Sequence, residues 1–417
     1  MTEFWQAIKG HPLKIFAICL FGLVLSNLDQ SFFGYAIPGI MAEFEVGIDI
    51  IGWVLSVSFM VAAMMMVVIG VAADHYGRSR VFAVCLILPA FLVGLHAFAP
   101  DIVSLTMLRA LAFGLTVSMI PLATTYTSEV SPDRYRGLLA GLLQVAYPIG
   151  WFLASVISVP ILAAYSWREI FLPAFLIIPV AIVVSRFLSE SQRFIGLQQT
   201  VESEEKVHWA GHIKTLTEPV FRRRVALCAA MLFLHGGAYA GTAFYFPTFL
   251  TETRGYTEEV AVGITGLSYG IGAVGYIAAA IIGEFFLTRR NTIALWMAIG
   301  TLAFLGFVWL GGTPATDIFW FAVMSVFFYG AIAVALPLVA EMFPTKARAT
   351  ATAVCGAAAQ VGFATYPVFV AQLVEPLGWN WAFTVVVVPS LALAVAATLG
   401  LQNLKSGMTL EETSRQT

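Results

Sequence analysis

Residues 14–38 read KIFAICLFGLVLSNLDQSFFGYAIP, a long apolar run with a single acidic residue, Asp29. A helix needs about 20 apolar residues to cross the roughly 30 Å hydrocarbon layer of a bilayer. This run therefore predicts a membrane-spanning helix. The run is too long for a signal peptide, and no small-residue cleavage site precedes a mature domain. We therefore expect it to be retained.

Eleven further apolar runs of similar length follow along the chain. They lie near 50–72, 80–99, 102–127, 137–164, 168–188, 224–251, 259–286, 291–312, 316–340, 348–373 and 379–401. The predicted fold class is an all-α polytopic membrane protein with twelve transmembrane helices. One long, charged segment separates the first six from the last six. The predicted parts are an N-terminal six-helix bundle (1–190), a cytoplasmic linker (191–223), a C-terminal six-helix bundle (224–403) and a short cytoplasmic tail (404–417).

The composition supports a chain that faces lipid. Hydrophobic residues make up 59% of the 417 residues and charged residues 11%, whereas a soluble protein has about 25% charged residues. The net charge of −2 and the lack of a basic tail argue against a nucleic-acid partner. The four cysteines lie in apolar runs without metal-ligand spacing. We expect no metal and no cofactor.

Basic residues set the expected orientation, because Lys and Arg are retained on the cytoplasmic side. With an even number of spans, both termini share one side. If that side is the cytoplasm, only Arg168 and Arg254 of the 22 basic residues lie outside, and only Arg109 lies within the membrane. Both termini are therefore predicted to be cytoplasmic.

The loop after the second run reads GVAADHYGRSR, residues 70–80. It resembles the signature loop of the major facilitator superfamily, G-x-x-x-D-x-x-G-R-x-R/K. Further loops resemble those of its sugar, aromatic-acid and organic-ion proton symporters: EVSPDRYRG (129–137), WREIF (167–171), EMFPTKAR (341–348) and WNWAF (379–383). The seventh and tenth runs lack the Q-Q-x-S-G-x-N and G-P-x-x-W motifs of true sugar porters, which argues against a strict hexose porter.

The resemblance implies the major facilitator fold, two pseudo-symmetric six-helix bundles that alternate access to a site near the midplane. It implies a functional monomer in the inner (plasma) membrane. It also implies an inter-bundle cytoplasmic gate formed by Asp74, Gly77, Arg78, Glu129, Arg136, Glu341 and Arg348. The alternative interpretation, that these residues are solvated surface charges, stays open.

Two ionisable residues lie clearly within predicted spans, Asp29 and Arg109. A charge at the bilayer centre costs at least about 2.5–3.5 kcal/mol, so such residues usually face the bundle interior and pair. Counted from the nearest charged ends of their helices, both lie in the outer half of the membrane, within reach of each other. The resemblance implies that Asp29 takes up a proton and Arg109 responds to it. A structural ion pair without proton transport stays open.

The predicted substrate-binding residues are polar or aromatic side chains on helices expected to line the pathway: Tyr35, Gln144, Tyr147, His235, Tyr239, Tyr245, Tyr329 and Gln360. Each of them could instead be a packing or interfacial residue, and for His235 binding and packing are equally open. Together with the positive pole at Arg109, they favour a small organic acid, with an aromatic ring as one option.

We therefore predict a proton-coupled symporter that takes up a small organic acid by alternating access, with the lipid bilayer as its environment. A sugar or polyol symporter and a drug or metabolite:proton antiporter are the transport alternatives. A membrane sensor on the same fold is a further alternative. No H-E-x-x-H, no G-x-S-x-G and no paired midplane aspartates occur, so an enzyme is not expected.

Overall fold

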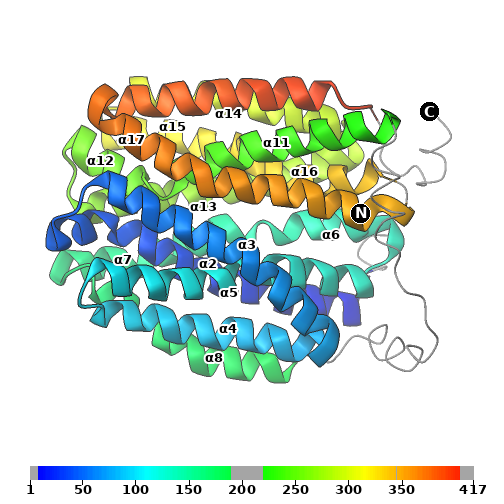
Figure 1. Cartoon of the computed structure of the whole chain (residues 1–417), viewed down its shortest axis with the longest axis horizontal. Coiled ribbons are helices and arrows are strands. Elements are labelled where there is room, and N and C mark those ends of the chain that lie inside the picture. The colour runs from blue at the N-terminus through cyan, green and yellow to red at the C-terminus, as the bar shows by residue number, and fades with distance from the viewer. Residues whose placement is uncertain (1–7, 189–218, 344, 404–417) are drawn as a thin grey trace.

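The computed structural model describes residues 8–188, 219–343 and 345–403 (Figure 1). The predicted linker and tail lie almost wholly outside these ranges. Within them, every regular element is a helix. The first half contains α2 (His11–Phe44), α3 (Ile48–Tyr76), α4 (Arg78–Leu95), α5 (Ile102–Val130), α6 (Arg136–Leu143), α7 (Ala146–Ala164) and α8 (Ala174–Arg186). The second half contains α11 (Pro219–Ala243), α12 (Phe246–Arg254), α13 (Glu258–Phe285), α14 (Arg289–Leu310), α15 (Pro314–Phe327), α16 (Ile332–Glu341) and α17 (Thr345–Leu399). Four short 3₁₀ turns complete the order: η1 (His96–Phe98), η2 (Asp133–Tyr135), η3 (Glu169–Phe171) and η4 (Tyr329–Ala331).

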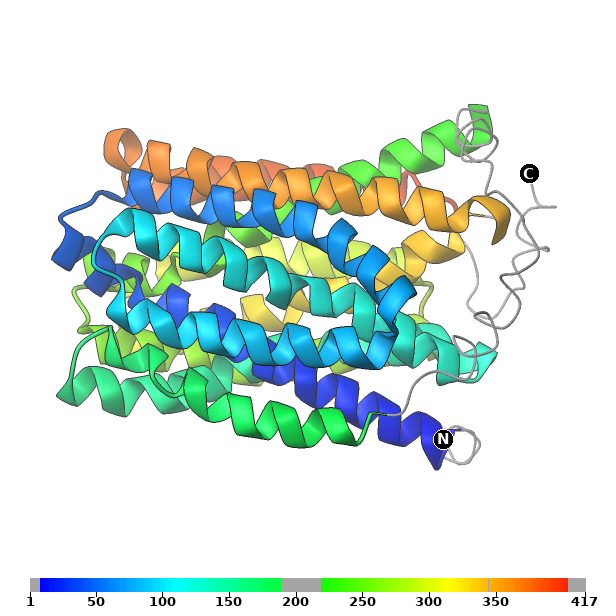
Figure 2. The same cartoon turned by 60° about the horizontal axis from the view of Figure 1, so that its bottom comes forward.

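The helices run side by side along the long axis of the molecule, with the first half in one layer and the second half in the other (Figures 1 and 2). The first described residues of α2 and the last residues of α17 lie at the same end, which we call the terminal end. The opposite end is the far end. The two halves meet mainly along α7 with α13 and along α3 with α17.

The described residues contain eleven helices long and apolar enough to span a membrane. The last of these, Thr350–Leu399, is two crossings merged into one element, because Gly378 has a non-helical conformation (φ 72°, ψ 163°) inside α17. A positive φ of this kind is readily available only to glycine. The chain turns there without a loop, so the eleven helices make the twelve predicted crossings.

Several crossings are broken along their length. The break between α6 and α7 precedes Pro148, and the break between α11 and α12 precedes Pro247. Proline has no N–H and its ring displaces the carbonyl four residues earlier, so an α-helix cannot continue regularly there. A third break, at η4, begins with Tyr329. The breaks place Gln144, Tyr245 and Tyr329 where the backbone leaves regular helix.

The outer surface explains the low charge of the chain. Large apolar side chains are exposed along the helices, for example Met64, Val67 and Val71, each more than 60% exposed. In water such a surface would cost about 25 cal/mol per Å². Against lipid it costs nothing, and the polar side chains Asp29, Gln30 and Arg109 are buried instead.

The two halves repeat one contact at the far end. The indole Nε1 of Trp167 donates to Oε2 of Glu43 at 2.7 Å, and Nε1 of Trp379 donates to Oε2 of Glu252 at 2.7 Å. Each bond joins the end of the first crossing of a half to the start of its sixth crossing. This repetition is the pseudo-symmetry expected from the six-plus-six arrangement.

Glycines bring the halves close at both ends. At the terminal end, Gly141 of α6 lies against the carbonyl oxygen of Ala333 in α16, where a Cβ would be only 2.4 Å from that oxygen. At the far end, Gly52 of α3 faces Ala371 of α17, where a Cβ would be 2.8 Å from the alanine Cβ. The halves are therefore in contact on both sides of the interior polar residues, toward the terminal end and toward the far end.

Candidate functional site

Asp29 of α2 and Arg109 of α5 lie together in the interior of the first half. Their side chains are 3% and 1% exposed, and the two charges interact through space. No nitrogen–oxygen pair between them comes within the 4.0 Å of an ion pair. Oδ1 of Asp29 and both Nε and Nη2 of Arg109 have no hydrogen-bond partner in the structure. The two groups are neighbours, and each keeps free hydrogen-bonding capacity.

Aromatic rings enclose the guanidinium of Arg109. Its Cζ lies 4.5 Å from the ring centre of Phe33, 4.4 Å from that of Phe113 and 5.5 Å from that of Phe244. We call these three rings the aromatic collar. A cation over an aromatic face gains up to about 2 kcal/mol when water is excluded, which offsets part of the cost of burial. Phe244 lies at the break between α11 and α12, so the second half completes the collar.

Four tyrosines from both halves form a closed group at the interface, which we call the tyrosine ring. The centres of Tyr147 and Tyr239 are 5.3 Å apart, as are those of Tyr239 and Tyr329. Tyr269 lies 5.7 Å from both Tyr329 and Tyr147. The hydroxyl of Tyr329 pairs with Thr242 at 3.0 Å. The buried hydroxyls of Tyr147 and Tyr269 interact with each other and with neighbouring tyrosines, but without ordinary hydrogen-bond geometry.

Trp151 of α7 connects the collar to the tyrosine ring. Its ring centre lies 5.6 Å from Phe244 and 4.9 Å from Tyr269. The hydroxyl of Tyr35 donates to the backbone oxygen of Trp151 at 2.8 Å, which holds α2 against α7 beside Trp151. The indole Nε1 of Trp151 is buried without a partner. Tyr239 also interacts electrostatically with Arg109, so the cation and the tyrosines belong to one buried region at the interface, which we call the chamber.

The chamber contains an unusual number of unpaired polar atoms. Nearly all buried polar groups in proteins have a hydrogen-bond partner, and each one left without a partner costs about 1–3 kcal/mol. The unpaired groups here belong to Asp29, Arg109, Tyr147, Trp151 and Tyr269. Water or a polar ligand would satisfy them. A fixed cation, aromatic faces and neutral hydroxyls suit an organic anion that carries a ring.

The other predicted binding residues have partners within the protein or lie apart from the chamber. The Tyr245 hydroxyl donates to the carbonyl of Pro367 at 3.0 Å, and Nε2 of His235 pairs with the carbonyl of Phe328 at 3.0 Å. These contacts favour packing roles for both residues. Nε2 of Gln360 contacts the sulfur of Met66 at 3.2 Å, while its Oε1 has no partner. Gln144 is half-buried at the break before α7.

The predicted gate residues lie at the terminal end. Arg78 pairs with Glu129 at 3.0 Å, and Nε of Arg136 donates to the carbonyl of Ser128 at 2.9 Å. In the second half, Arg289 pairs with Glu341 at 3.0 Å and with Glu284 at 2.6 Å. Each of these four contacts joins residues of the same half.

The guanidinium of Arg289, however, also reaches the first half. A Cβ at Gly137 would lie 3.1 Å from Nη2 of that arginine. Gly77, the glycine of the first signature loop, joins α3 to α4 at a φ of 96°. The side chains of Asp74 and Arg348 lie outside the part of the chain that is described.

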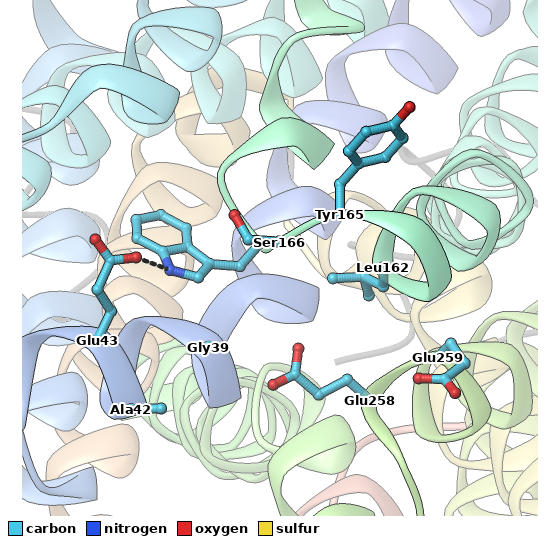
Figure 3. Close-up of a pocket in the computed structure, with 9 residues that line it drawn as sticks. Gly39, Ala42, Glu43, Leu162, Tyr165, Ser166, Glu258 and Glu259 are labelled. Carbon is cyan, nitrogen blue, oxygen red and sulfur yellow. Dashed lines mark hydrogen bonds between the residues drawn. The ribbon is translucent and has the colours of Figure 1, made fainter.

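A hollow of about 480 Å³ opens at the far end, between α2, the segment after α7 and the start of α13 (Figure 3). It is lined by Gly39, Ala42, Glu43, Leu162, Tyr165, Ser166, Trp167, Glu258 and Glu259. Three carboxylates give it acidic character. It lies on the surface, and none of the buried chamber residues lines it. Among the described residues, no group of three or more metal-ligating side chains occurs.

Five aromatic residues of the chamber were not among the predicted binding residues: Phe33, Phe113, Trp151, Phe244 and Tyr269. Trp151 directly follows the Pro148–Gly150 segment, and Tyr269 lies in GITGLSYGIGAVGY (263–276), where small residues mark a close helix contact. Those glycines do pack closely, since a Cβ at Gly266 would overlap Ser155 of α7. A bulky aromatic residue on such a glycine-rich helix could have indicated that Tyr269 lies at the interface between the halves.

The family model described as Major Facilitator Superfamily matches residues 19–336 and 318–414. A niacin transporter, NiaP, of Acinetobacter baylyi is 25% identical over 97% of this chain and 96% of its own length. The 4-hydroxybenzoate transporter PcaK of the same organism is 25% identical over 93% of this chain and 91% of its own. A crystal structure of a D-xylose-proton symporter superposes with a TM-score of 0.69 at 16% identity, covering 95% of this chain and 99% of that one.

Proposed function

Because this chain belongs to the Major Facilitator Superfamily of membrane transporters, we propose that it takes up a small organic acid, of aromatic type, together with protons. One observation carries the proposal. Asp29 and Arg109 lie side by side in a chamber closed by rings of both halves, and neither has its hydrogen-bonding capacity filled. The named cargoes of similar transporters, niacin and 4-hydroxybenzoate, are of this chemical type.

Charge balance explains how such a chamber couples anion and proton. With Asp29 ionised, its charge balances that of Arg109, and an incoming carboxylate adds an uncompensated negative charge. An uncompensated buried charge costs several kcal/mol. With Asp29 protonated, the positive charge of Arg109 is free to receive the carboxylate through two parallel N–H donors. Anion and proton therefore bind together and leave together, which is symport.

Alternating access follows from the division of the chamber between the halves. The first half supplies Asp29, Arg109 and Trp151, and the second supplies Phe244 and Tyr269. Rocking of one half against the other opens the chamber at one end and closes it at the other. We assign the terminal end to the cytoplasm of a cell whose inner membrane holds the protein. The Arg78–Glu129 and Arg289–Glu341 networks then belong to the cytoplasmic gate, and one chain suffices for transport.

The test uses purified protein in liposomes with an imposed pH gradient and radiolabelled 4-hydroxybenzoate or benzoate. We expect Asp29→Asn to abolish proton-driven accumulation and to retain exchange of internal for external acid, because a permanently neutral side chain leaves Arg109 free. The control is Asp101→Asn, an exposed residue that caps α5. Asp29→Asn protein that still accumulates acid along a pH gradient would refute the coupling.

The direction of coupling is tested in the same liposomes. Symport predicts that an acidic exterior drives the acid inward. If an acidic exterior instead drives preloaded acid outward, the protein is an antiporter.

A further inference from the structure

We propose that His96 is a positioning residue for the Arg109 guanidinium. Its neutral imidazole accepts a hydrogen bond from Arg109, directly or through one water, when Asp29 carries a proton. The inference rests on the proposed function and adds a third residue to the proton-coupling pair. His96 lies where α4 ends and η1 begins, and it is 1% exposed.

The protonation of the His96 ring follows from its hydrogen bond. Nδ1 lies 2.9 Å from the carbonyl oxygen of Leu92. Because a carbonyl only accepts, Nδ1 carries the ring proton and Nε2 is left as an acceptor. Nε2 is buried and has no hydrogen-bond partner among the described residues. A proton relay would have to release a proton from Nδ1, which is committed to the carbonyl. The geometry therefore favours a fixed acceptor over a relay.

The nearby groups that lack an acceptor belong to Arg109. The charge of Arg109 acts on His96 through space. Phe33 lies beside both, with its ring centre 6.4 Å from that of His96 and 4.5 Å from Cζ of Arg109. Within the part of the chain that is described, Nε and Nη2 of Arg109 are buried donors without a partner. Buried polar groups are nearly always paired. An unpaired acceptor and unpaired donors beside one phenyl ring are therefore each the missing partner of the other.

The imidazole is held in place from other elements. Phe171 of η3 stacks on it, with the ring centres 5.0 Å apart and the planes at 25°. Nη1 of Arg168 donates to the carbonyls of Ala97 and Ala99, at 3.0 and 2.8 Å, and so fixes the turn that follows His96. Because both the ring and its backbone are fixed, the unfilled Nε2 is a property of the fold.

The other charged groups around this turn already have partners: Glu43 with Arg168, Glu169 with Ser166, and Asp101 with Ser104. The helices α3 and α8, which also pack against α4, carry titratable groups only near their ends: Asp49, Asp74, His75 and Arg186. Arg109 and Asp29 are therefore the charged groups left to interact with the imidazole.

A neutral acceptor suits the coupling step better than a charged one. When Asp29 takes up a proton, Arg109 loses its counter-charge. A second carboxylate in place of His96 would restore that counter-charge and remove the attraction for the substrate anion. An imidazole satisfies one N–H and leaves the positive charge in place. The guanidinium has five N–H donors, and a carboxylate uses two of them, so His96 keeps its bond when the acid is bound.

The experiment measures dissociation constants of the purified full-length protein for benzoate and 4-hydroxybenzoate from about pH 5 to pH 9. His96→Phe keeps an aromatic ring against Phe171 and removes the acceptor. His96→Gln is the conservative variant, because its amide oxygen can accept where Nε2 did. The matched control is His11→Phe, since His11 is exposed at the start of α2 at the terminal end.

We expect acid affinity in the wild type to fall as the pH rises through a midpoint, at which Asp29 loses its proton. In His96→Phe, protonation of Asp29 leaves Arg109 without an acceptor, so the midpoint moves to lower pH by about one unit. The affinity at the acidic limit stays within about twofold of wild type, since the acid still binds Arg109. His96→Gln and the control keep the wild-type midpoint.

An unchanged midpoint in His96→Phe, or an equal shift in His96→Gln, would overturn the role of His96 and leave the proposed coupling standing. Wild-type protein that binds neither acid, or binds with the same affinity at every pH, would instead contradict the proposed function itself. Nitrogen NMR of wild-type protein with labelled histidine gives a second measurement if His96→Phe does not fold. With the resonance assigned by its loss in His96→Gln, a protonated Nε2 in this pH range would also overturn the proposal.

Discussion

Gly141 and Gly52 allow the two halves to approach at opposite ends, so alanine at these two positions is expected to drive the protein in opposite directions. A Cβ at position 141 would lie 2.4 Å from the Ala333 carbonyl oxygen, where ordinary van der Waals contacts are 3.4–4 Å. The terminal end must therefore open by roughly 1 Å to accept it. Overpacking of this kind typically costs about 1–3 kcal/mol, which changes a conformational equilibrium by about 5- to 150-fold.

Gly52→Ala acts at the far end, where the added Cβ would be 2.8 Å from Ala371. It penalises closure there and favours the conformation that is open at the far end. Gly263→Ala is the matched control, because Gly263 also lies on an interface helix but its Cβ would be 3.8 Å from Val159. We expect no shift for this control.

The assay is pulsed electron spin resonance on pairs of spin labels in reconstituted protein. One pair, at Arg134 and Phe286, reports the terminal end, and the other, at Asp49 and Glu375, reports the far end. All four positions are exposed. Gly141→Ala should lengthen the terminal-end distances, and Gly52→Ala the far-end distances. If both variants lengthen the same pair, or if Gly141→Ala matches the Gly263→Ala control, the assignment of these contacts to opposite gates is wrong.

Three further predictions concern stability. Gly378→Ala should destabilise the protein by about 1–3 kcal/mol in thermal unfolding, because its φ of 72° with ψ of 163° is open only to glycine; an unchanged melting temperature would contradict this. Trp167→Phe removes the bond to Glu43, and because that carboxylate is 44% exposed we expect a loss of only about 1 kcal/mol. Tyr256 donates to Asp317 at 2.7 Å, and burial together with this carboxylate raises the pKa of the Tyr256 hydroxyl to about 12. Because the pKa of Tyr256 is higher in the folded than in the unfolded protein, its hydroxyl stabilises the fold fully below pH 10. This stabilisation is lost as the pH rises from 10 to 12. Tyr256→Phe should therefore reduce the loss of unfolding free energy between pH 10 and pH 12, measured by chemical denaturation.

The spans could be predicted from sequence because each crossing of the bilayer requires about 20 consecutive apolar residues, and such a run is visible locally in the sequence. The same argument located Asp29 and Arg109, since charges stand out in an apolar helix. It could not predict that Gly378 alone separates the last two crossings. A glycine in an apolar run is as common inside a helix as at a turn, and only the fixed φ distinguishes them.

The chamber was harder to predict, because choosing among 13 tyrosines requires knowing which face of each helix meets the other half. Tyr147, Tyr239 and Tyr329, three predicted binding residues, lie in one cluster, but Tyr269 of the same cluster was not among the candidates. Tyr245 was chosen for the same reasons as these, yet its hydroxyl bonds to the Pro367 carbonyl. Hydrogen bonds to carbonyls at helix breaks depend on tertiary packing, and no sequence pattern encodes them.

Phe244 belongs to the second half, yet it covers the guanidinium of Arg109 in the first half. Any rotation that separates the halves near Arg109 removes this ring and lets water reach the cation, which changes the electrostatic environment of the neighbouring carboxylate. Under the proposed mechanism, the position of this one ring links movement of the halves to the proton affinity of the carboxylate. The same packed ring would then hinder a leak of protons without cargo.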